Sequence, residues 1–277
     1  MANLQVLRKR LKNINSTWEL ALAMKTVSSV KFTKLNRINS AYSEYAEECR
    51  KALALFGKDG FKRSEDVKVK SRNCFIVLSN NRGFCGGFNA ELQKFFLSEY
   101  EKEAEQPLVY AMGKRIQKYC REKGIEAESR DLPDIPTIED AKAICRTAEI
   151  IFVSGEADNI YVIAQNHENM MTQKPRKVRI LPFDSDAVQS NILFLPDRES
   201  LGRNLAYDCL ASAVYGLMLS NATGAQAATM VAMKSACDNA EESSMNLETT
   251  INRIRQAQVT NSVIETSSGM AAGNLEL

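Results

Sequence analysis

The residues that interrupt helices are few in this chain, and they are unevenly placed. All six prolines of the 277-residue sequence lie between residues 107 and 196, and the first glycine is Gly57. Residues 1–56 therefore contain neither residue type, although glycine costs about 1 kcal/mol and proline about 3 kcal/mol inside a helix. Residues 203–267 again lack proline and contain only two glycines. These two absences predict one long helix at each end of the chain.

Several other absences narrow the classes of protein. Histidine occurs once, as His167, so a Cys–His or Ser–His pair would depend on that residue, which we expect to be a surface side chain. The seven cysteines are odd in number and contain no close pair. Reduced thiols in a cytosolic compartment therefore fit better than a disulfide framework or a zinc site. No run of 18 uncharged apolar residues predicts a membrane-spanning helix.

The stretch "SNNRGFCGGFNAEL" (79–92) has the layout of a phosphate-binding loop, because a hydrophobic run precedes it and a plausible helix follows. A P-loop needs GxxxxGK[ST], and no lysine follows these glycines before Lys94. The run "GFCGGF" does not match GxGxxG either. We expect the glycines to allow a tight turn and close packing. Cys85 could be acidified at a helix N-terminus, but no base lies nearby in sequence, so we expect a packing role.

Apolar residues of the N-terminal segment recur at alternating steps of three and four. Thirteen of sixteen such positions are apolar, where the overall composition predicts about seven. This pattern is typical of a coiled coil. The series is Leu4, Leu7, Leu11, Ile14, Trp18, Ala21, Lys25, Ser28, Phe32, Leu35, Asn39, Tyr42, Ala46, Cys49, Leu53 and Phe56.

The C-terminal segment carries a matching series, which is Ala240, Ser244, Leu247, Ile251, Ile254 and Gln258. Ten alanines between residues 203 and 246 would let a partner helix approach closely. We therefore predict that the two terminal helices wind antiparallel around each other. The polar seam residues Lys25, Ser28 and Asn39 would fix the register of this coiled coil.

The middle of the chain alternates between short strands and helices. This alternation predicts a parallel sheet covered by helices, a Rossmann-like open α/β domain inserted between the terminal helices. The predicted units are 1–56, 70–196 and 203–268. The predicted strands are 74–79, 107–112, 124–132, 159–166 and 177–183, and the predicted helices between them are 89–104, 114–123 and 137–149.

Charge is concentrated at the N-terminal end. The first 40 residues contain eight Lys or Arg and only one acidic residue, Glu19, whereas the net charge of the whole chain is only +2. This end is therefore expected to face an acidic surface on a partner.

Four sequence motifs, in order along the chain, are those of a known family. They are "MKTVSSVKF" (24–32), "SNNRGFCGGFN" (79–89), "MVAMKSACDNA" (230–240) and "NRIRQAQVT" (252–260). Together they resemble the γ subunit of the F-type ATP synthase, the rotary central stalk, and the resemblance covers essentially the full length.

The resemblance implies a non-catalytic rotor shaft without a cofactor or metal. Its coiled coil would enter the ring of α and β subunits, and its α/β foot would sit with the ε subunit on the membrane c ring. Ion-driven rotation would then change the β catalytic sites in turn. The expected location is peripheral, at the cytoplasmic face of a bacterial plasma membrane, and no nucleic acid is expected as a partner. A nucleotide-binding α/β enzyme and a coiled-coil adaptor are the alternatives.

The resemblance also assigns expected roles to individual residues. The expected contacts with the β subunits are Met24, Lys25, Val27, Lys31, Arg255, Gln256 and Thr260. The expected turn of the foot domain contains Gly83, Cys85, Gly86, Gly87 and Asn89. Four positions depart from the usual residues of the family, namely Ala211, Ala225, Thr229 and Ser262.

Overall fold

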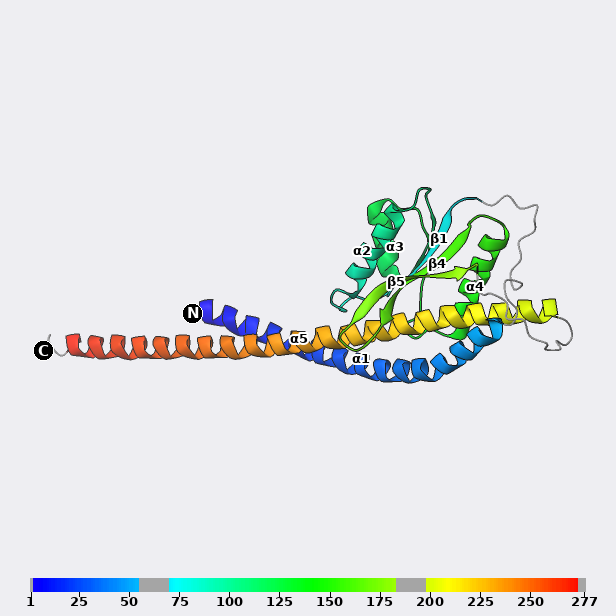
Figure 1. Ribbon diagram of the computed structural model, residues 1–277. Coiled ribbons are helices and arrows are strands. Elements are labelled where there is room, and N and C mark those ends of the chain that lie inside the picture. The colour runs from blue at the N-terminus through cyan, green and yellow to red at the C-terminus, as the bar shows by residue number, and fades with distance from the viewer. Residues whose placement is uncertain (1, 55–69, 183–197, 274–277) are drawn as a thin grey trace. The chain divides into compact units, whose positions relative to one another are not determined.

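The computed structural model describes residues 2–54, 70–182 and 198–273. Figure 1 shows a small sheet with short helices and two much longer terminal helices. The elements in chain order are α1 (Ala2–Ala54), β1 (Asn73–Leu78), α2 (Phe88–Glu101), β2 (Leu108–Met112), α3 (Lys114–Lys123), β3 (Glu128–Arg130), α4 (Ile138–Val153), β4 (Asn159–His167), β5 (Gln173–Leu181) and α5 (Arg198–Gly273).

The chain packs as two compact units. One unit is residues 27–231, and the other consists of the described parts of 1–26 and 232–277. The boundaries predicted from sequence follow the ends of the two long helices, whereas the compact units divide each long helix between them. The prediction that the α/β domain reaches residue 196, and that the seam reaches Phe56, lies outside the described residues.

The sheet has the strand order β3-β2-β1-β4-β5. Strands β1 to β4 are parallel, as predicted, and β5 is antiparallel to β4. The prediction of a wholly parallel sheet is therefore wrong for β5. Only residues 168–172 separate β4 from β5, and a parallel crossover needs a dozen residues or more.

Strand β1 is the centre of the hydrophobic core because both of its faces are covered. Cys74, Ile76 and Leu78 point into a cluster that includes α4 and α5. Phe75 and Val77 point into a second cluster with α2 and α3. A strand buried on both faces appears as a continuous apolar run, which explains why "CFIVL" shows no alternation.

Within the unit 27–231, helix α5 is buried on nearly every side. Most residues from 209 to 227 are inaccessible to solvent. One side of this stretch packs against the sheet, and Leu219 and Ala222 pack against Leu35 of α1. Small residues make this burial possible. A Cβ at Gly224 would lie 3.2 Å from Phe88 Cε2 and 3.2 Å from Gln173 Cγ.

The predicted seam of α1 is confirmed. Every seam position from Leu4 to Cys49 is buried or half-buried. The polar seam residue Ser28 is only 6% exposed, while Lys25 and Asn39 are half-buried. The side chain of Leu53 lies outside the described residues.

In the other unit, residues 2–26 pack against residues 232–254 of α5. Ala21 packs with Met233 and Cys237, and the Ser244 hydroxyl donates a hydrogen bond of 2.9 Å to Asn15 Oδ1. The seam on α5 ends earlier than predicted. Gln258 is exposed, as is every residue from 255 to 268, because the antiparallel α1 ends opposite this region.

No helix in the described ranges combines the length and the apolar character needed to cross a bilayer.

Replacing Gly224 with valine should lower the free energy of unfolding by about 1–3 kcal/mol, because the added carbons would press on Phe88 and Gln173. Gly216→Ala is the control in the same helix, since nothing lies within 4 Å of a Cβ there. That change should raise stability by up to about 1 kcal/mol through helix propensity alone. Denaturant unfolding followed by circular dichroism measures both, and equal midpoints for the two variants would contradict this packing.

Backbone amides of residues 255–268 should exchange with deuterium about a hundredfold faster, or more, than those of residues 209–227 in the free chain. An exposed helix end without a partner opens locally, whereas a buried helix needs wider unfolding. Mass spectrometry of peptides from both segments gives the two rates in one experiment. Comparable protection in both segments would show that the exposed end is stabilised by something else.

Candidate functional site

Two regions contain the residues that the sequence singles out. One is the glycine-rich turn between β1 and α2, and the other is the exposed end of α5 with its counterpart on α1. The geometry of the turn decides whether a phosphate fits, and the second region shows what the long helices present to a partner.

The glycine-rich turn uses backbone conformations that favour glycine. Phe84 has φ of 62° and Gly86 has φ of 56°, both in the left-handed region. Gly83 serves a different purpose, because a Cβ there would lie 2.3 Å from Arg115 Nη2. The glycines therefore shape the turn and let an arginine of α3 lie against it.

The N-terminus of α2 carries a negative charge of its own. The N-cap residue is Gly87, which has no side chain to cap the helix, and the first turn contains the acidic residue Glu91. A Cβ at Gly87 would lie only 3.3 Å from Glu91 Oε1, so the carboxylate folds back over the helix start. A carboxylate near the helix N-terminus would repel a phosphate bound there.

The crevice at the carboxyl ends of β1 and β4 is filled. In open α/β sheets this is where ligands bind, because the strand order reverses there. Here Cys85 and Phe88 pack against Ala225 of α5. The Gln165 side chain also donates a hydrogen bond of 2.8 Å to the Phe88 carbonyl. A nucleotide would have to displace α5 from the sheet.

Cys85 has the environment of a packing residue. It is only 4% exposed, and Asn89 Nδ2 lies 3.0 Å from its sulfur. Burial raises the pKa of the Cys85 thiol, although the contact with Asn89 partly opposes this. The thiol therefore stays protonated near neutral pH and is a poor nucleophile. All seven cysteines are free and buried, and the described residues contain no cluster suited to a metal ion.

The expectation that His167 is a surface side chain is wrong. It ends β4, and its ring packs edge-on against Phe32 of α1 with centroids 5.7 Å apart. Burial lowers the pKa of its imidazole. Its Nδ1 is buried and has no hydrogen-bond partner among the described residues. No local sequence pattern indicates this contact, because Phe32 is 135 positions away.

The residues of α1 assigned to β-subunit contacts differ in exposure. Met24 packs with Met233 and Cys237 in the coiled coil, and Lys25 is half-buried. Val27 is 53% exposed and is available to a partner. Of these three residues, Val27 is therefore open to a partner, whereas Met24 and Lys25 are partly buried in the seam of the coiled coil.

Lys31, the fourth residue of α1 assigned to the β-subunit contacts, forms an ion pair within its own unit. Its ammonium lies 2.6 Å from Asp134 Oδ2, and Arg82 lies 3.4 Å from the same oxygen. The side chain of Lys31 is only 24% exposed. The positive charge of Lys31, which the resemblance assigns to a contact with a β subunit, is therefore neutralised by Asp134 within the unit 27–231. The sequence could not reveal this, because the partner is about 100 positions away.

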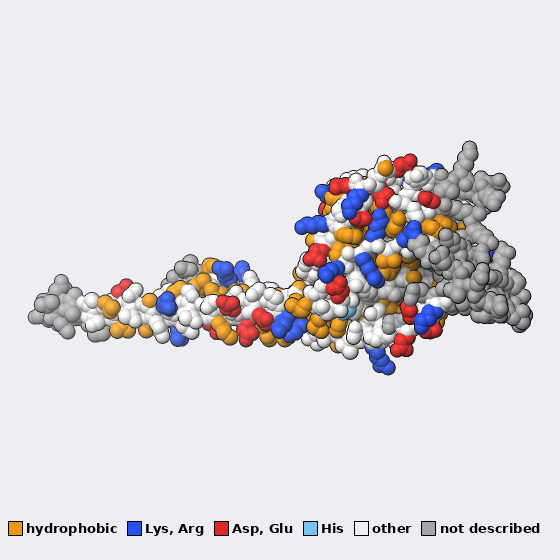
Figure 2. Space-filling view, in the orientation of Figure 1, with side chains coloured by type: hydrophobic (Ala, Val, Ile, Leu, Met, Phe, Trp, Pro, Cys, Tyr) orange, Lys and Arg blue, Asp and Glu red, His pale blue; other side chains and the backbone are white. Residues whose placement is uncertain are grey.

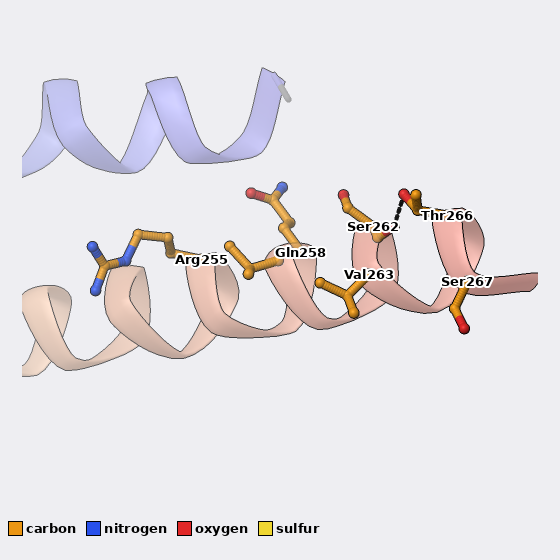
Figure 3. A pocket seen from close by; sticks show the side chains of 7 residues that line it. Arg255, Gln258, Ser262, Val263, Thr266 and Ser267 are labelled. Atoms are coloured by element: carbon orange, nitrogen blue, oxygen red, sulfur yellow. Dashed lines mark hydrogen bonds between the residues drawn. The ribbon is translucent and has the colours of Figure 1, made fainter. Parts of the chain in front are cut away.

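The end of α5 presents an open face. Arg255, Gln256 and Thr260 are all exposed, as a contact with another chain requires. A shallow groove of about 570 Å³ lies along this stretch. Figure 3 shows the side chains that line it. Its lining residues all belong to α5: Arg255, Gln258, Val259, Ser262, Val263, Thr266 and Ser267.

Two apolar residues of this face, Val259 and Val263, were not predicted as site residues. They are 59% and 62% exposed. Their spacing of four places them on one side of a helix. The signal was present in the sequence as an apolar pair beyond the last seam residue, Ile254, but it resembles a continuation of the seam.

The four residues that depart from the usual residues of the family lie in different environments. Ala211 is 1% exposed and Ala225 is 5% exposed, so both are small residues at closely packed positions of α5. Thr229 turns its hydroxyl back to the Ala225 carbonyl at 2.8 Å. Ser262 instead lines the open groove.

Charge is distributed differently along the molecule. Figure 2 shows acidic and basic side chains mixed over the visible face of the foot domain, which is the α/β part of the chain within residues 70–182. On the first turns of α1, by contrast, Arg8, Lys9, Arg10 and Lys12 are all exposed. The basic character predicted for the N-terminal helix is therefore available at the surface.

Comparisons with known proteins give a single family. The family model described as ATP synthase matches residues 3–272. The ATP synthase gamma chain of Desulforamulus reducens is 30% identical, and the alignment covers 98% of this chain and 99% of that protein. The ATP synthase gamma chain of Glaesserella parasuis is also 30% identical, over 98% of this chain and all of that protein.

Solved structures show the same fold. A rotor chain of the Euglena gracilis mitochondrial ATP synthase superposes with a TM-score of 0.69 at 14% identity, covering 93% of this chain and 99% of that one. A central stalk chain from the Tetrahymena thermophila mitochondrial enzyme gives 0.63 at 17% identity, over 78% and 99% of the two chains. From the full-length match to the family model and to these relatives, the chain belongs to the family of ATP synthase γ chains.

Proposed function

We propose that this chain is the central shaft of an F-type ATP synthase rotor. It couples ion-driven rotation of a membrane c ring to conformational changes at the β-subunit catalytic sites. The observation that carries this proposal is α5 itself. It is one helix of 76 residues, or about 110 Å at 1.5 Å per residue. Its early part is buried in the foot, and its last part is exposed and unpartnered.

A shaft needs a firm hold at one end and a contact surface at the other. The stretch 209–227 of α5 is held on nearly every side, with contacts to the sheet and to α1. The seam between residues 2–26 and 232–254 then keeps two helices wound together. Two wound helices resist bending and twisting better than one, because both helices must deform together.

The contacts proposed for the β subunits are exposed polar residues beside apolar ones. Arg255, Gln256 and Thr260 lie on the bare end of α5, next to Val259 and Val263. A patch with apolar residues at its centre and an arginine at its edge is typical of a protein interface.

The N-terminal helix would add to this interface. Val27 is the most open of its proposed contacts, with Met24 and Lys25 partly exposed beside the seam. The exposed arginines and lysines between residues 8 and 12 suit acidic loops on the surrounding subunits. Lys31 is left out of this set because Asp134 neutralises it.

The remaining partners and the location follow from the same role. The foot domain would sit with an ε subunit on the c ring, which would hold the chain at the cytoplasmic face of a bacterial membrane. The chain itself would carry no catalysis. The filled crevice and the Glu91 carboxylate beside the α2 N-terminus support this division of labour.

Co-purification tests the shaft role most directly. A tagged form of the chain, expressed in its native organism, should co-purify with α and β subunits that have ATPase activity. Recovery of the chain without them would refute the proposal. Calorimetric titration of the isolated chain with ATP tests the runner-up, a nucleotide-binding enzyme. We expect no heat of binding because Ala225 of α5 packs against the turn and the Glu91 carboxylate lies near the start of α2.

Replacing Arg255 and Gln256 together with alanine should lower ATPase activity of the assembled complex by about tenfold. This is the size expected when anchor residues of an interface are removed. The matched control changes an arginine and an amide elsewhere on α5, Arg203→Ala with Asn204→Ala, which are also exposed. Steady-state hydrolysis and ATP-driven ion pumping measure the effect. Equal activity in both double variants would remove the proposed contact.

A further inference from the structure

A short arm between β3 and α4 reaches helix α1. It reads Pro133-Asp134-Ile135-Pro136, so each end is fixed by a proline whose φ is locked near −65°. The next residue, Thr137, begins α4 with a capping box to Asp140. The arm is therefore short, stiff and anchored directly to a helix of the foot.

The first contact of this arm is ionic. Asp134 Oδ2 accepts a hydrogen bond of 2.6 Å from Lys31 Nζ and lies 3.4 Å from Arg82 Nη2. Asp134 and Lys31 are 27% and 24% exposed, so water screens this pair less than a pair of fully exposed side chains. Arg82, at 71% exposed, adds a second positive charge from the glycine-rich turn.

The second contact is apolar and directly adjacent. Ile135 packs into the cluster formed by Leu35 and Tyr42 of α1 with Leu219 of α5. Lys31 and Leu35 are four residues apart, so they lie on the same face of α1. One face of α1 is therefore held by two neighbouring residues of the arm.

The base of the arm is braced to the rest of the foot. The Asn81 amide donates to the Leu132 carbonyl, one residue before the arm. The same side chain accepts a hydrogen bond of 3.0 Å from the Lys114 backbone N–H at the start of α3. A force on the arm is thus passed to the glycine-rich turn, to α3 and to α4.

We propose that Asp134 is a positioning residue that fixes the rotation of α1 about its own axis relative to the foot. Lys31 is then an internal tie to the foot and not a contact for another subunit. Apolar burial is non-directional, so the Ile135 contact alone resists separation but allows α1 to turn. A charge-assisted hydrogen bond is directional and prevents that turning. Its consequence for torque rests on the proposed shaft function.

The variants follow from the geometry. Asp134→Asn and Lys31→Ala each break the pair, Asp134→Glu keeps the charge, and Lys31→Asp with Asp134→Lys exchanges the two charges. The control is Asp131→Asn in the same loop. Asp131 is 60% exposed and pairs at 3.8 Å with Lys114, so it joins two parts of the foot without touching α1.

Amide exchange of residues 27–37 in the isolated full-length chain tests the tie without any other subunit. Asp134→Asn and Lys31→Ala should each speed exchange in this segment about tenfold, the effect of losing one hydrogen bond to a charged group. Asp134→Glu and the exchanged pair should recover most of the protection, and Asp131→Asn should leave it unchanged. Unchanged exchange in Asp134→Asn, or no recovery in the exchanged pair, would overturn the proposal.

The reassembled complex in vesicles tests the mechanical consequence. Asp134→Asn and Lys31→Ala should lower the ratio of ATP-driven ion pumping to ATP hydrolysis by about the same factor, at least twofold, and Asp131→Asn should not. A loss with Lys31→Ala alone would make Lys31 a contact with another subunit and overturn its role as a tie. If the chain fails to assemble with α and β subunits, the shaft function fails, while the exchange experiment still decides the tie.

Discussion

The structure depends on the burial of one stretch of helix on nearly every side. Residues 209–227 of α5 are covered by the sheet on one side and by α1 on another. Alanines and Gly224 keep the helix thin enough to fit, since even one more carbon at Gly224 would touch Phe88. The same α-helix therefore runs through the core of the unit 27–231 and continues into the other unit.

The same packing covers the glycine-rich turn. The turn keeps the layout of a nucleotide site, with a strand before it and a helix after it. Ala225 of α5 packs where a ligand would lie, next to Cys85 and Phe88. Packing against α5 therefore fills the crevice where a ligand binds in other open α/β domains. The arm with Asp134 and Ile135 adds a second contact, with α1.

Much of the fold could be predicted from the sequence because its signals are local. The seam of α1 followed from spacing alone, and strands β1, β2 and β4 followed from short apolar runs between turns. The reversed direction of β5 was missed because alternation of strands and helices was assumed to continue. The contacts of Lys31 and His167 with other parts of the chain were missed for another reason. Their partners Asp134 and Phe32 are more than 100 positions away, and no local pattern marks such pairs.

The burial of every thiol has a practical consequence for observing the motion of this protein. Desolvation raises the pKa of Cys74, Cys145 and Cys209 to about 12 and that of Cys120 to about 11. Maleimide dyes react with exposed thiolates, so these native sites are slow targets. A single cysteine introduced on the exposed end of α5 would be the fastest-reacting thiol in the chain. A fluorophore or bead could then be attached there without first removing the native cysteines.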